Sequence, residues 1–255
     1  MSEPELVVLA DAAAVVAEGA RRIAATLAAT VDERGRADWC VTGGSTSTGI
    51  YRSLVDGALR DVVPWAAVHV WWGDDRFVPR GDPLCNVTAF DDLMLGDRGV
   101  PIPMEQLHPF RTSEAIGQGH DAAWCAATLA EELRSVGPPV EAGWPSFDLL
   151  MLGIGSDGHI LSVFPGSAAI GARDLAMAIP APNHIAPPVE RVTLNPGLVT
   201  TARRVLVLAT GSGKASVIGE IFGTTLDPDR WPAQLALRAG ATWILDEAAA
   251  ARLEP

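Results

Sequence analysis

The sequence has few of the groups that crosslink a chain or bind nucleic acid. Only three of its 255 residues are cysteines, Cys40, Cys85 and Cys125, and they are far apart and odd in number. No disulfide framework or metal-binding spacing is present, which indicates a reducing compartment. Acidic residues outnumber basic ones by 31 to 19, a formal net charge of −12. This excess disfavours nucleic acid as a partner, and an anionic ligand would need a locally positive pocket.

Long apolar runs are also lacking. No stretch approaches the ~20 apolar residues that a membrane-spanning helix needs. The first residues, MSEPELVVLAD, have neither the basic start nor the long apolar core of a signal peptide. We therefore expect a cytoplasmic protein with no membrane partner.

Lysine is nearly absent, since Lys214 is the only lysine beside 18 arginines. A single lysine in such a composition indicates that its position needs an ammonium group. Hydrophobic residues make up 48% of the chain and charges of both signs are mixed, as in folded proteins. The length suits one α/β domain, which we expect to span residues 1–255.

One stretch organises the chain. The apolar run Phe147–Leu152 predicts a buried strand, and a glycine-rich turn, 153–159, follows it. Ligand sites of open α/β sheets lie at the carboxyl ends of strands, where glycines such as Gly155 and Gly158 let the backbone approach a ligand closely. His159, which ends the turn near Asp157, can exchange protons near neutral pH.

The same turn satisfies the dinucleotide-binding pattern G-x-G-x-x-G. That pattern needs a full helix directly afterwards, but Pro165 and Gly166 end any helix within two turns. It also needs an acidic residue at the end of the next strand, whereas Asp174 precedes the next apolar run. A nicotinamide cofactor is therefore disfavoured, and we expect no cofactor and no metal.

A second loop, Gly43-Gly44-Ser45-Thr46, follows the short strand 39–41 and precedes a helix. Glycines, hydroxyls and the free N–H groups of a helix start suit a phosphate. A plain tight turn with a capping hydroxyl fits the loop equally well, so both interpretations stay open here.

Two further strands end in charged groups. Asp74 and Arg76 follow the strand 68–72, where they form either part of a site or a surface salt bridge. Lys214 follows the strand 203–209 and a glycine turn, where it either holds an anion or is a solvated helix lysine.

Strands and helices alternate along the chain. This order predicts a three-layer αβα fold with a mostly parallel, doubly wound, Rossmann-like sheet. The expected strands are 6–10, 39–41, 68–72, 147–152, 175–179, 192–194, 203–209 and 242–245, and the expected helices are 11–30, 48–59, 88–95, 113–136, 214–222, 231–238 and 248–253.

Four motifs together resemble one family, the 6-phosphogluconolactonases, which are related in fold to the glucosamine-6-phosphate deaminases. The family signature L-G-x-G-x-D-G-H with S-x-F-P-G stands at 152–159 and 162–166. The motif W-x-D-E-R-x-V-P stands at 72–79 with Asp75 where Glu is usual. Cys85-Asn86-Val87 replaces Ser-Asn-Tyr, and R-x-T-L begins at Arg191.

The resemblance implies hydrolysis of 6-phospho-D-glucono-1,5-lactone to 6-phosphogluconate by a monomeric enzyme of the oxidative pentose phosphate pathway. As a hypothesis, His159 acts as general base on water, Asp157 orients its ring, and Arg76 clamps substrate or phosphate. Backbone N–H groups of residues 155–158 stabilise the developing oxyanion. The remaining expected substrate-binding residues are Gly43, Gly44, Ser45, Thr46, Asp74, Gly155, Gly158, Lys214 and, as a weaker candidate, Arg191.

Two alternatives remain. A deaminase of the related family carries a glutamate five residues after the histidine, where this chain has Phe164, which cannot relay protons. A non-catalytic sugar-phosphate sensor would keep the phosphate loops but has no need of His159 and Arg76.

Overall fold

A seven-stranded parallel sheet forms the centre of the molecule in the computed structural model, which describes residues 3–253. The strand order is β1-β12-β11-β8-β2-β3-β5. Its inner strands are apolar and buried along their length, as expected for a parallel sheet covered on both faces. The strands are β1 (Glu5–Leu9), β2 (Ala37–Val41), β3 (Val68–Trp72), β5 (Leu107–His108), β8 (Leu149–Gly153), β11 (Val205–Ala209) and β12 (Ala241–Asp246).

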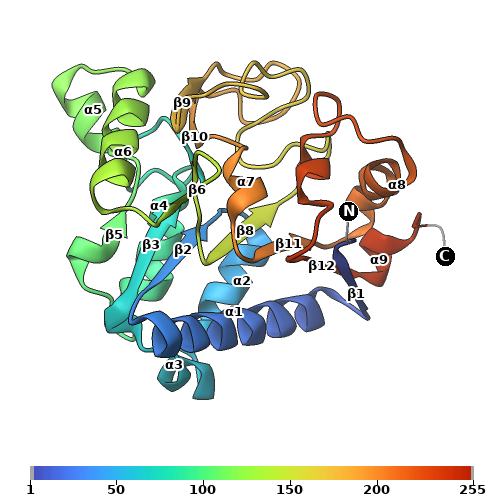
Figure 1. Ribbon diagram of the computed structural model, residues 1–255, viewed down its shortest axis with the longest axis horizontal. Coiled ribbons are helices and arrows are strands. Elements are labelled where there is room, and N and C mark those ends of the chain that lie inside the picture. The colour runs from blue at the N-terminus through green and yellow to red at the C-terminus, as the bar shows by residue number, and fades with distance from the viewer. Residues whose placement is uncertain (1–2, 254–255) are drawn as a thin grey trace.

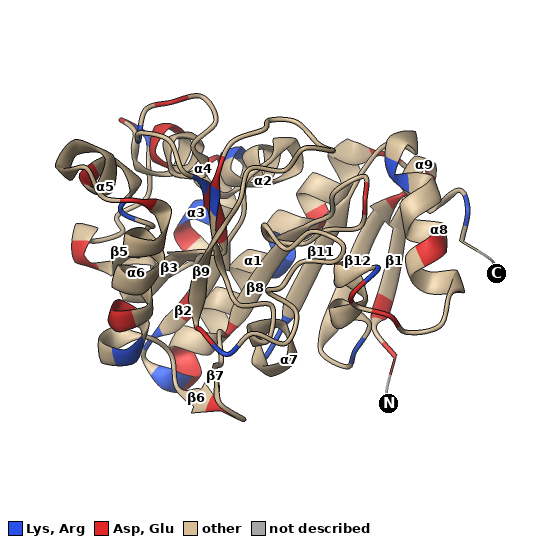
Figure 2. Cartoon of the chain, turned by 90° about the horizontal axis from the view of Figure 1, so that it is seen from above, with Lys and Arg blue, Asp and Glu red and all other residues tan. Residues whose placement is uncertain are grey.

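Helices lie on both faces of this sheet (Figures 1 and 2). The helices α1, α2 and α3 pack together on one face, and α5, α6 and α7 lie on the other. The helices are α1 (Ala12–Arg34), α2 (Ser45–Val55), α3 (Ala58–Val62), α4 (Asn86–Phe90), α5 (Thr112–Gln118), α6 (Ala122–Val136), α7 (Leu198–Thr201), α8 (Ala215–Gly223) and α9 (Glu247–Ala250). This arrangement confirms the predicted three-layer, doubly wound fold.

Two small antiparallel sheets accompany the central one. The strands β4 (Asp74–Arg76), β10 (Arg191–Leu194) and β9 (Ala176–Ile179) form a three-stranded sheet that packs against α6. The pair β6 (Val140–Glu141) and β7 (Trp144–Pro145) forms a short hairpin. The expected strands 175–179 and 192–194 therefore exist, but they lie outside the parallel sheet.

Several predicted helix boundaries are wrong. The expected helix 113–136 is broken into α5 and α6, because Gly119 adopts a left-handed φ of 75° and Asp121 starts a new helix by accepting a bond from Trp124 N. The helix predicted at 48–59 begins at Ser45 and ends at Val55. Residues 91–95 form a π-helical turn after α4, and residues 232–236 form a 3₁₀ turn. The strands β4, β5, β6 and β7 were not predicted.

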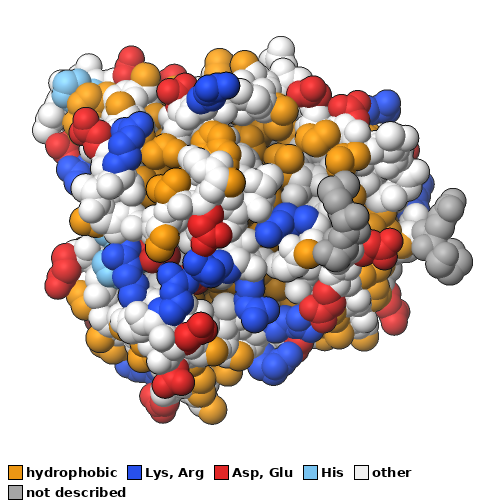
Figure 3. Space-filling view, in the orientation of Figure 1, with side chains coloured by type: hydrophobic (Ala, Val, Ile, Leu, Met, Phe, Trp, Pro, Cys, Tyr) orange, Lys and Arg blue, Asp and Glu red, His pale blue; other side chains and the backbone are white. Residues whose placement is uncertain are grey.

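The amino-terminal ends of several strands are held by ion pairs. Arg34 pairs with the buried Asp148, and Arg203 lies 2.6 Å from Glu141. On the face drawn in Figure 3, basic side chains gather in the lower half with acidic ones among them. Within residues 3–253, no helix has the length and apolar character required to cross a membrane.

Candidate active site

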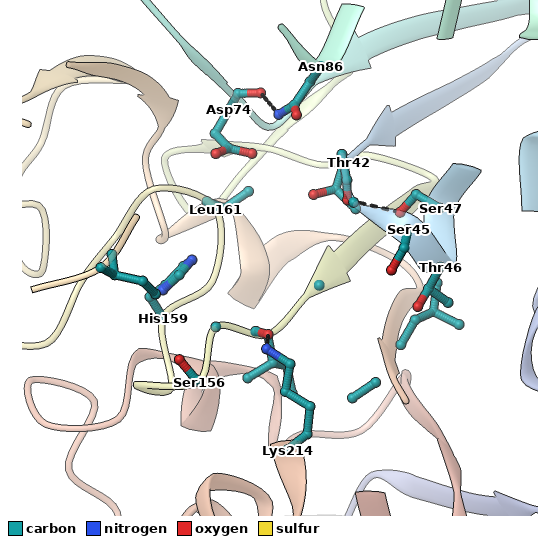
Figure 4. A pocket seen from close by; sticks show the side chains of 18 of the residues that line it. Thr42, Ser45, Thr46, Ser47, Asp74, Asn86, Ser156, His159, Leu161 and Lys214 are labelled. Carbon is teal, nitrogen blue, oxygen red and sulfur yellow. Dashed lines mark hydrogen bonds between the residues drawn. The ribbon is translucent and has the colours of Figure 1, made fainter. Parts of the chain in front are cut away.

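A cavity of about 310 Å³ opens at the carboxyl ends of β2, β8 and β11. The strands β4 and β10 of the small sheet close it on a further side. Figure 4 shows side chains from separate parts of the chain converging: His159 and Ser156 from the turn after β8, Asp74 from β4, Ser45 and Thr46 from α2, and Lys214. The cavity therefore lies where a doubly wound sheet places its ligands.

The turn after β8 carries an imidazole and a carboxylate in contact. His159 Nδ1 lies 2.5 Å from Asp157 Oδ1, and the backbone N–H of His159 reaches the same oxygen at 3.3 Å. An ionised carboxylate only accepts hydrogen bonds, so His159 Nδ1 carries a proton and donates it. In the neutral ring Nε2 then has a free lone pair, and the ring projects toward the cavity (Figure 4).

A second imidazole, which the sequence did not reveal, holds the other oxygen of Asp157. His184, from the proline-rich loop 180–190, has its Nε2 2.9 Å from Asp157 Oδ2. Burial works against ionisation of Asp157, but the hydrogen bonds from His159 and His184, together with the charge of His159, outweigh it and hold the pKa of Asp157 well below its ordinary value. Asp157 is therefore a carboxylate at neutral pH.

The close contact between His159 and Asp157 requires a glycine at position 155. A Cβ atom at Gly155 would lie 2.0 Å from His159 Nδ1 and 2.4 Å from Asp157 Oδ1. Any side chain there would displace the imidazole from the carboxylate.

The structure does not bring Gly158, a predicted substrate-binding residue, into the cavity lining, and a Cβ atom there would meet the ring of Trp231 at 2.7 Å. Its φ of 85° also favours glycine. Its N–H donates to Gly155 O, while the Gly155 N–H donates to His159 O. These two N–H groups shape the turn and are not free for an oxyanion.

The small sheet places two guanidinium groups side by side. In the antiparallel ladder Arg76 of β4 is the direct partner of Arg191 of β10, and directly opposed residues point to the same face. Asp74, two residues before Arg76, points to that face as well, and Ser162 Oγ donates to its Oδ2 at 2.6 Å. All three charged residues line the cavity. Burial and the neighbouring Arg76 lower the pKa of Arg191.

Asp75 lies between Asp74 and Arg76 in β4, so its side chain points to the opposite face of the strand. It does not line the cavity and is fully buried. Its Oδ1 accepts bonds from the backbone N–H groups of Arg76 and Asn86, and the Cys85 thiol donates to Oδ2 at 3.3 Å. Burial raises the pKa of Asp75 to about 6. The carboxyl thus holds the chain that presents Asn86, whose Oδ1 accepts a bond from Arg76 Nη1 at 2.6 Å.

The loop of glycines and hydroxyls forms the opposite wall. α2 begins at Ser45, earlier than predicted, so the first N–H groups of the helix lie at the cavity and have no partner within the helix. Thr46 Oγ1 lies 3.3 Å from Thr210 Oγ1, which connects this helix start to the loop after β11. Lys214 Nζ donates to Ile154 O at 2.7 Å, and burial lowers its pKa. Among the residues that the structure describes, no side-chain hydroxyl caps α2, which disfavours the plain capped turn, and Lys214 lies in the cavity wall instead of being a solvated helix lysine.

All the predicted site residues except Gly158 and Asp157 line the cavity. Asp157 stands behind His159 without lining the cavity. Residues that the sequence analysis missed are Asn86, Ser156, Thr210, His184 and Leu161, which adopts a left-handed φ of 54° in the cavity wall. The predicted residues that line the cavity are Gly43, Gly44, Ser45, Thr46, Asp74, Arg76, Gly155, His159, Arg191 and Lys214.

A family model described as glucosamine-6-phosphate isomerases/6-phosphogluconolactonase matches residues 10–244. The chain belongs to this family. The stretch matched includes every strand end that lines the cavity. In the described range, 3–253, no group of three or more His, Cys, Asp or Glu side chains could hold a metal ion.

Named members of the family resemble the chain along nearly its whole length. The 6-phosphogluconolactonase of Streptomyces coelicolor is 32% identical over 251 residues, which are 98% of this chain and 95% of that protein. The 6-phosphogluconolactonase of Mycobacterium tuberculosis is 34% identical over 245 residues, 95% of this chain and 96% of that protein. A solved 6-phosphogluconolactonase of Trypanosoma brucei superposes with a TM-score of 0.85 at 30% identity and covers 100% of both chains. The resemblance inferred from the motifs is confirmed.

Proposed function

We propose that the protein hydrolyses 6-phospho-D-glucono-1,5-lactone to 6-phospho-D-gluconate. The observation that carries this proposal is the Asp157–His159 pair, which faces a cavity that also holds three cationic side chains: Arg76, Arg191 and Lys214. A base beside a locally positive cavity suits a phosphorylated ester in a chain whose net charge is −12. Relatives named 6-phosphogluconolactonase support the same substrate.

His159 acts as the general base in this mechanism. Its Nε2 takes a proton from a water molecule while the water oxygen forms a bond to C1 of the lactone. The C1–ring oxygen bond then breaks, and His159 returns the proton to the departing ring oxygen. Asp157 keeps the proton on Nδ1 and stabilises the imidazolium between the two steps.

Arg76 stabilises the negative charge that develops on the C1 oxygen, with Arg191 beside it. Backbone N–H groups of Gly155 and Gly158 are already bonded within the turn, which favours a side-chain donor for this role. Arg76 lines the cavity, and its Nη1 donates to Leu84 O at 3.0 Å and to Asn86 Oδ1 at 2.6 Å. These bonds hold the guanidinium in place beforehand, as the stabilisation of a developing charge requires.

The phosphate group binds at the opposite wall. Unpaired N–H groups at the start of α2, the hydroxyls of Ser45, Thr46 and Thr210, and the Lys214 ammonium together suit a dianion. Asp74, held by Ser162, is left to accept bonds from sugar hydroxyls.

The related deaminase chemistry is disfavoured by Phe164. This side chain is buried, and its ring centroid lies 4.8 Å from that of His159. It packs against the imidazole at the place where a proton-relaying carboxyl would be needed, and it cannot ionise.

A lactonase assay tests the proposal. Freshly made 6-phosphogluconolactone is given to the wild type, His159→Ala and the control His120→Ala, whose exposed ring stacks on Trp124. We expect rapid turnover by the wild type and the control after subtraction of spontaneous hydrolysis, and a loss of about 10³-fold or more in His159→Ala. Turnover that survives in His159→Ala would refute the general base but keep the function. An inactive wild type that binds 6-phosphogluconate would favour a sensor, and release of ammonia from glucosamine 6-phosphate would favour the deaminase.

We further propose that the enzyme works as a monomer of one domain in the cytoplasm. Every group invoked above comes from one chain, so catalysis needs no second subunit. The three cysteines are buried and unpaired, which suits a reducing compartment.

A further inference from the structure

We infer that His184 is a positioning residue: it fixes the Asp157 carboxylate that orients His159 and fastens the loop 180–190 over the cavity. This inference rests on the proposed lactonase function. Neither the glycine-rich turn nor the strand-end motifs contain His184, which lies 27 residues beyond Asp157 in the sequence.

The carboxylate lies between two imidazoles. Asp157 Oδ1 faces His159 Nδ1 at 2.5 Å, and Oδ2 faces His184 Nε2 at 2.9 Å. With both oxygens held, the carboxylate cannot rotate about its χ2 angle, so the aim of His159 is fixed through it. This bonding requires His184 to carry its proton on Nε2, whereas His159 carries it on Nδ1.

The ring of Phe164 packs against His159, His184 and Arg191. Its ring centroid lies 4.8 Å from that of His159 and 5.5 Å from that of His184, the latter edge to face at 87°. The guanidinium of Arg191 lies over the same ring at 5.9 Å. One buried aromatic side chain thus contacts the base, the positioning residue and an arginine of the cavity.

The loop that carries His184 is attached at two places. Beyond His184, Arg191 donates to Pro187 O and Val189 O at 3.1 and 3.2 Å. On the other side the bond to Asp157 connects the loop to the turn after β8. Ile185, the next residue, lines the cavity between these attachments. Loss of the His184 bond therefore loosens the cavity wall as well as the carboxylate.

The charges around Asp157 determine the sign of the effect. His159 and His184 donate to it directly, Lys214 acts on it through space, and Arg191 faces the same Phe164 ring from β10. The His184 bond withdraws negative charge from the carboxylate. Its removal leaves more of that charge to His159 and favours the imidazolium form, which is inactive as a base.

The test compares wild type, His184→Ala, His184→Gln and the control His120→Ala in kcat, KM and the pH profile of kcat/KM. Gln places an amide N–H donor where the imidazole Nε2–H stood. In His184→Ala we expect kcat to fall about tenfold and the acid limb of the profile to move up by about half a pH unit. His184→Gln should recover most of both, and His120→Ala should match the wild type. An unchanged acid limb in His184→Ala, or no difference between Ala and Gln, would overturn the inference.

A second readout does not depend on turnover. Nitrogen-15 spectra of the ligand-free protein should show His159 as the Nδ1–H tautomer and His184 as the Nε2–H tautomer. The midpoint of the His159 titration should rise in His184→Ala and return in His184→Gln. A wild type that fails to hydrolyse the lactone refutes the proposed function, whereas a His159 titration indifferent to residue 184 refutes this inference.

Discussion

Two hydrogen-bonded chains of side chains each join two histidines and one acid. The acid is central in the cavity chain, formed by His159, Asp157 and His184, and terminal in the buried chain, formed by His69, His108 and Glu132. In the cavity the carboxylate of Asp157 lies between His159 and His184. At the β3–β5 edge of the sheet, His108 lies between His69, 3.0 Å away, and Glu132, 2.6 Å away. Both chains are linked throughout by hydrogen bonds.

The second chain lies within packed side chains. The ring of His108 is 2% exposed and stacks on Trp71 with centroids 3.8 Å apart. The ring of His69 is nearly parallel to that of His108, with centroids 5.3 Å apart and its Nδ1 3.0 Å from His108 Nε2. The nitrogen of His108 that faces away from Glu132 is occupied by His69, whereas the corresponding nitrogen of His159 is left to the cavity. A histidine–carboxylate pair can therefore act as a base only where the second nitrogen has room for substrate.

The two chains also differ in electrostatics. Burial, together with the charge of Arg36, lowers the pKa of His69 to about 4, so this ring is neutral at pH 7. In the cavity the dominant feature is the ionised Asp157, which supports a positive charge on its neighbours. His69 therefore resists protonation, whereas Asp157 presents a negative charge to the two imidazoles beside it.

The largest difference between the two chains is expected in kcat when the acid of each is replaced by its amide. Asp157→Asn keeps the shape of the side chain but removes its charge, so it no longer holds the Nδ1–H tautomer of His159 or stabilises the imidazolium. We expect kcat to fall by roughly 10²–10⁴-fold. Steady-state lactone hydrolysis measures this fall, and a decrease of less than threefold would contradict the role of Asp157.

Glu132→Gln is the matched control. It makes the same change in the buried chain, where Glu132 accepts from His108 Nδ1. We expect kcat to stay within about twofold of the wild type, because no group of this chain lines the cavity. Equal losses of kcat in Asp157→Asn and Glu132→Gln would mean that the buried chain serves catalysis as much as the cavity chain does.

Much of the cavity chain could be predicted from the sequence, because its parts are local. Asp157 and His159 are two residues apart in a glycine turn after an apolar strand, and such turns lie at ligand sites of parallel sheets. The strands β2, β3, β8, β11 and β12 were predicted within two residues at either end for the same reason: each is a short apolar run.

The rest depends on contacts between distant residues. β4 has only three residues, two of them acidic, and exists because β10 pairs with it across more than a hundred residues. The bonds of His184 to Asp157 and of His69 to His108 arise only when separate elements meet. The glycine pattern likewise does not reveal that Trp231 packs against Gly158.

The next largest effect concerns stability. His108→Ala removes a buried ring stacked on Trp71 and leaves Glu132 and His69 without their partner. We expect it to lower the free energy of unfolding by about 2–4 kcal/mol while kcat stays near that of the wild type. Urea unfolding together with the lactone assay measures both. A stable but inactive His108→Ala protein would mean that the buried chain also serves catalysis.

The smallest effect is a pH dependence of stability in the buried chain. His69 has a pKa of about 4 in the folded protein, against 6.5 for an unperturbed histidine. Between these values the unfolded chain binds a proton that the folded chain refuses, so the contribution of His69 to stability is complete above pH 6.5 and is lost as the pH falls toward 4. Because the ring is only half-buried, we expect a loss of about 1–2 kcal/mol, less than the shift alone implies.

His69→Gln isolates this contribution, since Gln keeps a donor for His108 but does not titrate. Urea unfolding at pH 7.0, 5.5 and 4.5 should show the stability difference between wild type and variant moving against the wild type as the pH falls. A difference that is constant over this range would mean that His69 is protonated as readily when folded as when unfolded. The buried chain would then resemble the cavity chain in charge, and only the packing around His108 would still distinguish the two.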